Sequence, residues 1–148
     1  VTDRDSRTVG WITRQEKRIP KYLYSKGLKK SKLLFGQSLI PENTSAVHVT
    51  EGPLDAMWLD QLGFPAVALL GMSMSKKQRD LILTLSTKEI ILCLDNDQAG
   101  KIGRDRALDL LHGKITLSYI KLPKKYKDVQ DVRSYDILNN AIKNKHYW

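Results

Sequence analysis

The chain has 148 residues, which is enough for one domain, or for one domain with a small appendage. Its single cysteine excludes an internal disulfide and a cysteine-rich zinc site, and a core residue such as Cys93 is compatible with a reducing cytoplasm. No apolar run is long enough to span a membrane, so we expect no membrane partner.

The net charge of +9 is unevenly distributed along the chain. Between Arg14 and Lys32 there are eight lysines and arginines and one acidic residue, Glu16. Such a concentration of positive charge favours a polyanionic partner, most commonly nucleic acid. Tyr22 and Tyr24 lie in the same segment, and aromatic rings between cations suit the stacked bases of a single strand. The alternatives are a solvated lysine-rich surface and tyrosines that pack in a core.

Apolar runs alternate with amphipathic stretches through the rest of the chain. After a short strand at 9–13, buried strands are predicted at 46–50, 66–70, 90–94 and 115–120, and helices at 53–62, 76–85, 101–111 and 135–145. This alternation predicts an α/β fold with a parallel sheet of about four strands, flanked by helices on both faces. We assign the α/β domain to residues 46–148 and a small, basic α+β subdomain to residues 1–45. The apolar face expected for helix 53–62 contains Leu54, Met57, Trp58 and Leu62.

Acidic residues follow three of the predicted strands. Glu51 ends strand 46–50, Asp95 and Asp97 directly follow strand 90–94, and the loop after strand 115–120 carries Asp128 and Asp131. Because all strands of a parallel sheet point the same way, these carboxylates are expected to converge at one edge. Oxygen donors without Cys or His nearby suit Mg²⁺ or Mn²⁺ better than zinc. Gly100 is expected to permit a tight turn before the helix that starts at Lys101. The alternative to a metal site is that the Asp and Asn residues after the strand serve as turn and helix-cap residues.

Two motifs, Glu-Gly-Pro-Leu-Asp-Ala at 51–56 and Asp-Asn-Asp-Gln-Ala-Gly at 95–100, together resemble the Toprim domain. This fold is shared by DnaG-type primases, topoisomerases, OLD-family nucleases and RecR-type recombination proteins. The primases fit best, because Leu-Gly at 70–71, Lys-Asp-Val-Gln-Asp at 127–131, Pro-Lys-Tyr-Leu-Tyr-Ser at 20–25 and Leu-Phe-Gly at 34–36 also resemble their motifs. Two departures are Tyr24, where Asn is usual, and an extra residue between the two Asp of the 127–131 loop. The second is similar to primases of phages or mobile elements.

The resemblance implies the catalytic core of a DNA primase, a nucleotidyltransferase of the bacterial cytoplasm or nucleoid. It would use Mg²⁺ or Mn²⁺ to make RNA primers from ribonucleoside triphosphates on a single-stranded DNA template, and a replicative helicase would contact regions outside this chain. The implied catalytic residues are Glu51, Asp95 and Asp97, with Glu51 as a metal ligand or a proton acceptor. The implied metal ligands are Glu51, Asp95, Asp97, Asp128 and Asp131.

Further residues are candidates for contacts with substrate. Lys21, Tyr22, Lys29 and Lys30 are candidates for binding the template, and Lys101 and Arg104 for binding phosphates, with surface solvation as the alternative for the last two. Asp55 also matches a family position, but an acidic residue in the first turn of a helix is favoured by the helix dipole in any case. We therefore expect Asp55 to support the site rather than to act in catalysis.

Two other classes of function remain open. Nucleases and topoisomerases use the same acidic set to cleave DNA, but a topoisomerase also needs a nucleophilic tyrosine, and no tyrosine here is marked for that role. The basic amino-terminal part favours a primase. A non-catalytic DNA-binding module, as in RecR-type proteins, is the other alternative, and the complete acidic set argues against it.

Overall fold

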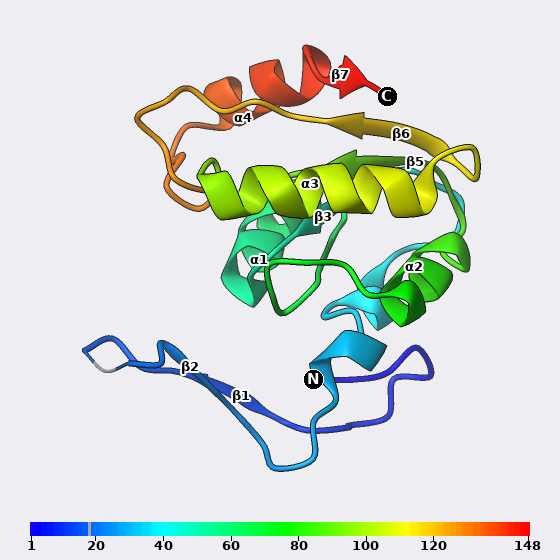
Figure 1. The fold of residues 1–148 in the computed structure, drawn as a ribbon, viewed down its shortest axis with the longest axis vertical. Helices are drawn as coiled ribbons and strands as arrows, with labels where there is room; N and C mark the ends of the chain where they lie inside the picture. The colour runs from blue at the N-terminus through cyan, green and yellow to red at the C-terminus, as the bar shows by residue number, and fades with distance from the viewer. Residues whose placement is uncertain (18) are drawn as a thin grey trace.

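A computed structural model of the protein describes residues 1–17 and 19–148, so Arg18 of the basic segment lies outside the described residues (Figure 1). The main body has three layers, with one sheet between two layers of helices. None of the helices in the described ranges is long and apolar enough to cross a membrane.

The central sheet contains five strands in the order β4-β3-β5-β6-β7. Four of them are parallel, as predicted: β3 (Thr44–Thr50), β4 (Ala66–Ala68), β5 (Thr87–Leu92) and β6 (Thr116–Tyr119). The fifth, β7 (His146–Tyr147), pairs antiparallel with β6 and was not predicted. A two-residue edge strand has no apolar run to reveal it, and the predicted last helix extended over the residues that precede it.

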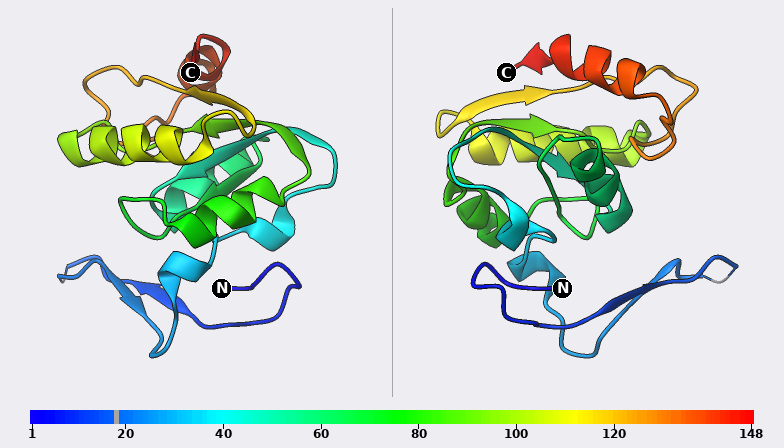
Figure 2. Two further views of the ribbon diagram at one scale, coloured as in Figure 1. Left: turned by 45° about the vertical axis from the view of Figure 1, so that its right-hand side comes forward. Right: turned by 180° about the vertical axis from the view of Figure 1, so that it is seen from behind.

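Helices cover both faces of the sheet, as expected (Figure 2). On one face, α2 (Lys76–Leu83) and α3 (Gln98–Leu111) pack against Val47 and Val49 of β3. On the other face, α1 (Pro53–Gln61) and α4 (Tyr135–Lys143) pack against Ile91 of β5. This alternation along each strand follows from the period of two residues in β-structure.

The predicted buried face of α1 was partly wrong. Met57 is 54% exposed, whereas Ala56 and Leu59 are buried against the sheet. The side chains at positions 53, 56 and 59 of the helix face the sheet. The small side chain of Ala56 leaves room for the helix to approach the strands closely. Trp58 and Leu62 pack at the margin of the same core cluster.

The amino-terminal part is a two-stranded antiparallel ribbon, β1 (Ile12–Arg14) with β2 (Tyr22–Tyr24), followed by two short 3₁₀ helices, η1 (Lys30–Lys32) and η2 (Gln37–Leu39). Figures 1 and 2 show the ribbon extending along one end of the body. It is attached through Leu34, which is fully buried in the core, and through paired backbone hydrogen bonds of 2.9 and 3.0 Å between Phe35 and Ala68.

One buried side chain on α2 fastens the basic segment to the body. The Gln78 amide is 1% exposed and donates hydrogen bonds to the carbonyls of Lys30 at 3.1 Å, Leu33 at 3.0 Å and Leu69 at 2.7 Å. Its carbonyl oxygen accepts the Ser75 amide at 3.0 Å, which completes the cap of α2. Gln78 therefore links the amino-terminal segment, the residue that follows β4 and the start of α2.

Candidate active site

The connections of the sheet create a crevice between β3 and β5. From these two neighbouring strands the chain leaves in opposite directions, through α1 to β4 and through α3 to β6. Such a switch point, at the carboxyl ends of parallel strands, is where α/β sheets bind ligands. Glu51 follows β3 and Asp95 lies just beyond β5, and the Asp95 amide donates a hydrogen bond to Glu51 Oε1 at 3.2 Å. The topology thus brings together two of the predicted carboxylates.

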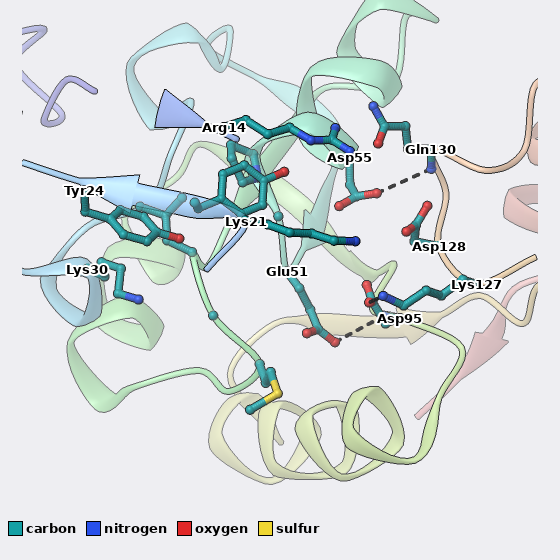
Figure 3. Close-up of a pocket in the computed structure, with 16 residues that line it drawn as sticks. Arg14, Lys21, Tyr24, Lys30, Glu51, Asp55, Asp95, Lys127, Asp128 and Gln130 are labelled. Carbon is teal, nitrogen blue, oxygen red and sulfur yellow. Dashed lines mark hydrogen bonds and ion pairs between the residues drawn. The ribbon is translucent and has the colours of Figure 1, made fainter. Parts of the chain in front are cut away.

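A cleft of about 310 Å³ separates this edge of the sheet from the amino-terminal ribbon (Figure 3). Glu51, Asp55, Asp95 and Asp128 line one side, and basic and aromatic side chains line the other: Arg14, Lys21, Tyr22, Tyr24 and Lys30. Three of the four template-binding candidates therefore lie here, whereas Lys29 does not line the cleft. Arg14 was missed, although its register opposite Tyr22 in the ribbon places it at the same end.

The carboxylates in the cleft repel one another in partly buried positions. Burial, together with repulsion from Asp95, raises the pKa of Glu51 from 4.5 to about 7. Burial and repulsion from Asp128 and Asp95 likewise raise the pKa of Asp55 from 3.8 to about 7. Burial also raises the pKa of Asp95, against the opposing effect of the Lys127 ammonium. An additional cation in the cleft would relieve this repulsion.

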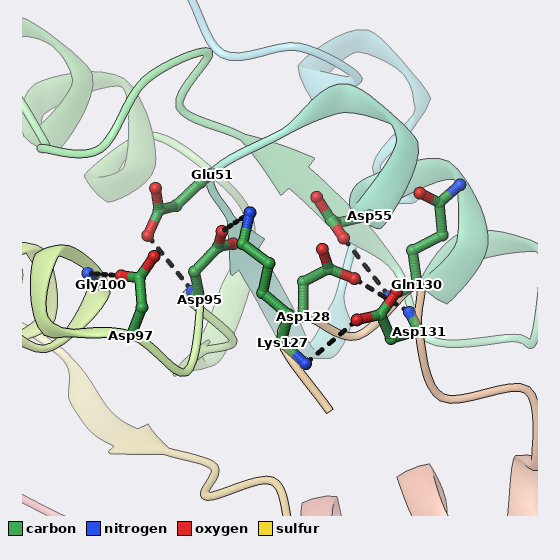
Figure 4. Close-up of polar contacts among 9 residues, drawn as sticks. All are labelled: Glu51, Asp55, Asp95, Asp97, Gly100, Lys127, Asp128, Gln130 and Asp131. Carbon is green, nitrogen blue, oxygen red and sulfur yellow. Dashed lines mark hydrogen bonds and ion pairs between the residues drawn. The ribbon is translucent and has the colours of Figure 1, made fainter. Parts of the chain in front are cut away.

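Lys127 supplies one positive charge to the acidic side, and sequence reasoning did not single it out. Its Nζ lies 3.6 Å from Asp95 Oδ2, and this pairing with Asp95 raises the pKa of the ammonium. Figure 4 shows Lys127 between two groups of carboxylates, with Glu51 and Asp95 on one side and Asp128 on the other. The lysine carries part of the compensating charge that a bound cation would supply.

Two of the predicted metal ligands, Asp97 and Asp131, lie outside the cleft lining. Asp97 Oδ1 accepts the Gly100 amide at 2.8 Å and caps α3, as the capping interpretation anticipated. Asp131 Oδ2 accepts the Lys127 amide at 3.1 Å, and neither Asp97 nor Asp131 lines the cleft. The predicted tight turn at Gly100 was wrong, because this residue lies inside α3. Its lack of a side chain serves instead to let the helix approach the Asp95 carbonyl.

The donor set suits a hard divalent cation, although the side chains are not gathered around one point. Among residues 1–17 and 19–148, no three Asp, Glu, His or Cys side chains converge closely enough to hold a metal ion as they stand. The carboxylates that line the cleft are nevertheless oxygen donors, as Mg²⁺ and Mn²⁺ prefer, and no His or Cys of the described residues is part of the lining. Binding would require rotation of these side chains and release of Lys127 from Asp95.

The Toprim-like family model matches residues 48–133, which is more than half of the chain. The chain belongs to this family. It is 37% identical over 123 residues to a DNA primase of Thermotoga maritima, and 33% identical over 147 residues to a DNA primase of Legionella pneumophila. These matches cover 76% and 90% of this chain but only 21% and 25% of the two primases.

Solved structures agree with the family assignment. The structure of the DnaG catalytic core matches 99% of this chain with a TM-score of 0.85 and 25% sequence identity, and the match covers 52% of that structure. The Toprim fold and the likeness to DnaG-type primases are therefore confirmed. The chain spans about half of that core and a quarter or less of the curated primases.

Within this Toprim-like domain, Asn96 ties the acidic loop to the strand end. Its side-chain amide donates to the carbonyls of Tyr126 at 3.1 Å and Leu122 at 3.3 Å, and its backbone amide donates to the Lys127 carbonyl at 2.6 Å. The loop that carries Lys127 and Asp128 is thereby held beside Asp95. The only signal in the sequence was an Asn between two Asp residues after a strand.

The two phosphate-binding candidates lie apart from the template-binding candidates. Lys101 and Arg104 of α3 line a second pocket, of about 420 Å³, and not the cleft. Asp95 lines both cavities and forms part of the wall between them. The domain thus presents a cleft of mixed charge and a mainly basic pocket on the two sides of one carboxylate.

Proposed function

We propose that this protein is the catalytic core of a DNA primase, a nucleotidyltransferase that synthesises RNA primers on single-stranded DNA. The observation that carries the proposal is the cleft at the switch point, in which a basic and aromatic ribbon faces a set of carboxylates. The two curated DNA primases similar to this chain support the same role. The ribbon is what distinguishes this proposal from a metal-dependent nuclease, because it provides a surface for a template strand.

The template is proposed to bind along the ribbon side of the cleft. Arg14, Lys21 and Lys30 would contact phosphates, and the rings of Tyr22 and Tyr24 would contact bases. Lys30 Nζ lies 4.3 Å from the centre of the Tyr24 ring, so a base that stacks on that face displaces the ammonium towards the backbone. Lys29, exposed next to η1, would extend the phosphate contacts beyond the cleft. Binding of this kind is strongly salt-dependent and largely independent of base sequence.

The acidic side is proposed to hold Mg²⁺ or Mn²⁺. Glu51, Asp95 and Asp128 are the ligands that line the cleft, and Asp97 and Asp131 would join them by exchanging their present hydrogen bonds. When bound, the metal supplies Lewis acidity to the attacking 3′-hydroxyl and charge neutralisation to the departing pyrophosphate. Glu51, with a pKa of about 7, is suited to accept a proton near neutral pH or to serve as a ligand.

The remaining residues are proposed to position the substrate and to neutralise its negative charge. Lys127, once released from Asp95, carries its charge to the triphosphate of the incoming ribonucleotide. Asp55 supports the site through the 3.4 Å hydrogen bond that it accepts from the Gln130 amide, next to Asp128. We further infer that the protein acts in the bacterial cytoplasm or nucleoid and that a replicative helicase contacts parts of the protein outside this chain.

One reaction tests the proposal. The protein is mixed with single-stranded DNA, labelled ribonucleotides and Mg²⁺ or Mn²⁺, and new RNA and cut DNA are read from the same gel. The Asp95→Ala variant is the test, and Asp109→Ala, an exposed aspartate on α3, is the matched control. We expect metal-dependent RNA from the wild type and the control, and none from Asp95→Ala. Cut DNA without RNA would contradict the primase proposal and indicate a nuclease. DNA binding that is unaffected by Asp95→Ala, with neither product, would indicate a binding module.

A further inference from the structure

The loop that follows β4, residues 69–75, forms part of the cleft wall through Leu70, Gly71 and Met72. Leu70 has a φ of 59°, a left-handed conformation that is uncommon for a bulky side chain. Its side chain is only 3% exposed and packs in the core cluster on the α1 side of the sheet. The burial of Leu70 therefore fixes the point at which the chain leaves β4 and turns along the cleft.

Contacts on both sides of Met72 hold the backbone of this loop. Gly103 of α3 lies so close that a Cβ on it would overlap the Met72 carbonyl oxygen. The next residue, Ser73, accepts a hydrogen bond from Arg106 Nη1 at 3.2 Å, and Met74 is buried in the core. The position of Met72 is thus set by α3 and by the core rather than by contacts of its own side chain.

The Met72 side chain itself is 64% exposed and lines the cleft. Among the described residues of the lining, the other aliphatic side chains, Pro53 and Leu70, are buried. A methionine thioether is polarizable and makes favourable contacts with the faces and edges of aromatic rings. Tyr22 and Tyr24 belong to the opposite, ribbon wall of the same cleft (Figure 3). A flat ring that entered here would find apolar or aromatic groups on both sides.

The order of the strands places Met72 near the carboxylates. The end of β4 is next to the end of β3, where Glu51 lies, and the end of β5 with Asp95 comes after it. Two strand spacings are about 10 Å. A base held at Met72 would therefore lie beside the acidic part of the cleft, and not at the outer end of the ribbon.

We propose that Met72 is a positioning residue for the template strand, against which one base packs on the side opposite Tyr22 and Tyr24. The contact is made with the flat face of the base, so it tolerates any base but requires that a base be present. It holds the strand beside Glu51 while the cations of the ribbon contact the phosphates. The inference deepens the proposed function and rests on it, because it assumes that a template strand enters this cleft.

Protection from oxidation tests the contact, because the three methionines of the chain have different surroundings. Hydrogen peroxide gives one oxygen atom to the thioether sulfur and leaves water, and mass spectrometry with peptide fragmentation assigns each sulfoxide. In EDTA, a saturating single-stranded oligothymidine is expected to slow the oxidation of Met72 by about threefold or more. Met57, which is 54% exposed on α1 outside the cleft lining, should react at an unchanged rate, and the buried Met74 should remain unoxidised.

Binding of a normal and an abasic strand separates a base contact from a general structural change. Fluorescence anisotropy in EDTA compares Met72→Ala with Met57→Ala, which truncates a similarly exposed methionine outside the cleft. For Met72→Ala we expect about fivefold weaker binding of oligothymidine, about 1 kcal/mol, and unchanged binding of an abasic strand of the same length. Met57→Ala should bind both strands like the wild type. Met72→Leu, which keeps an apolar side chain of similar volume, should retain most of the affinity.

The outcomes distinguish this inference from the proposed function. If Met72 is unprotected in a saturated complex, the inference is overturned and the ribbon remains a template site. The same holds if Met72→Ala binds oligothymidine as tightly as the wild type, or loses affinity equally for both strands. If the wild type binds neither strand at low salt, the template site fails and this inference with it. Neither metal nor RNA synthesis enters these measurements, so they are independent of the Asp95→Ala reaction.

Discussion

Gly100→Ala tests whether α3 is held against the Asp95 backbone as closely as the structure indicates. A Cβ at residue 100 would lie 2.0 Å from the Asp95 carbonyl oxygen and 2.7 Å from its carbonyl carbon, where real Cβ atoms keep at least 3.0 Å. Both neighbours are backbone atoms, so the first turn of α3 and the Asp95 segment must move apart by about an ångström. This movement displaces both the Asp97 cap and the Asp95 carboxylate.

Gly100→Ala is expected to destabilise the protein, which is the opposite of what helix propensity alone would produce. Alanine in place of glycine within a helix normally stabilises by about 1 kcal/mol. Overpacking against a backbone that must shift costs about 3 kcal/mol, the upper end of the usual range, so after subtracting the gain we expect a net decrease of about 2 kcal/mol in the free energy of unfolding. For a domain of this length, each kcal/mol lowers the melting temperature by about 2–4 °C. If the proposed function holds, a displacement of about 1 Å at Asp95 would also lower the proposed RNA synthesis by about 100-fold.

Urea and thermal denaturation, followed by circular dichroism, measure the effect, with Gly71→Ala as the control. A Cβ at Gly71 meets no atom within 4 Å, and its φ lies outside the left-handed region. That variant is therefore expected to gain about 0.4–1 kcal/mol through the entropy of the unfolded chain. If Gly100→Ala proves as stable as wild type, or gains as Gly71→Ala does, the close approach is refuted, and with it the role of Gly100 in positioning Asp95.

Three further predictions concern single polar side chains. Asn96→Ala, which removes the side-chain hydrogen bonds to the 122–126 carbonyls, should lower the free energy of unfolding by about 1–3 kcal/mol and speed trypsin cleavage after Lys124. Asp55→Asn should stabilise the metal-free protein by about 1–3 kcal/mol at pH 8 and by little at pH 4, as measured by thermal melts in EDTA. The raised pKa of about 7 means that the aspartate destabilises the fold increasingly as the pH rises from about 4 through 7. Gln78→Leu removes the side-chain donor from the carbonyls of Lys30, Leu33 and Leu69, of which the Leu69 bond is fully buried, and should cost about 1–3 kcal/mol in urea denaturation.

Each of these has a distinct contrary result. Unchanged trypsin sensitivity in Asn96→Ala would mean that the loop is held by other contacts. A stabilisation by Asp55→Asn that does not vary with pH would trace it to hydrogen bonding rather than to charge. Gln61→Leu makes the same substitution at an exposed position of α1. An equal decrease in the free energy of unfolding in that variant would show that the hydrogen bonds of Gln78 do not stabilise the fold.

Local patterns in the sequence were enough to predict the body of the fold. The apolar run at the end of β5 is buried on both faces of a parallel sheet, and a strand of that kind needs continuous hydrophobic residues. The convergence of Glu51 and Asp95 was predictable as well, because strands that run in parallel end at one edge. Both inferences start from local patterns, since each strand is recognised within a few residues and the alternation of strands with helices then sets the strand direction.

The tertiary structure alone decided which side chains lie opposite those carboxylates in the cleft. The orientation of the ribbon, and so the presence of Arg14 in the cleft, depends on the burial of Leu34 and on the hydrogen bonds of Gln78, which join residues more than forty positions apart. Nor does the motif itself reveal that Asp97 caps a helix while Asp95 meets Lys127, since both aspartates follow the same strand. Whether a carboxylate points into a cleft or caps a helix depends on backbone direction and on distant partners, and only the folded chain brings these together.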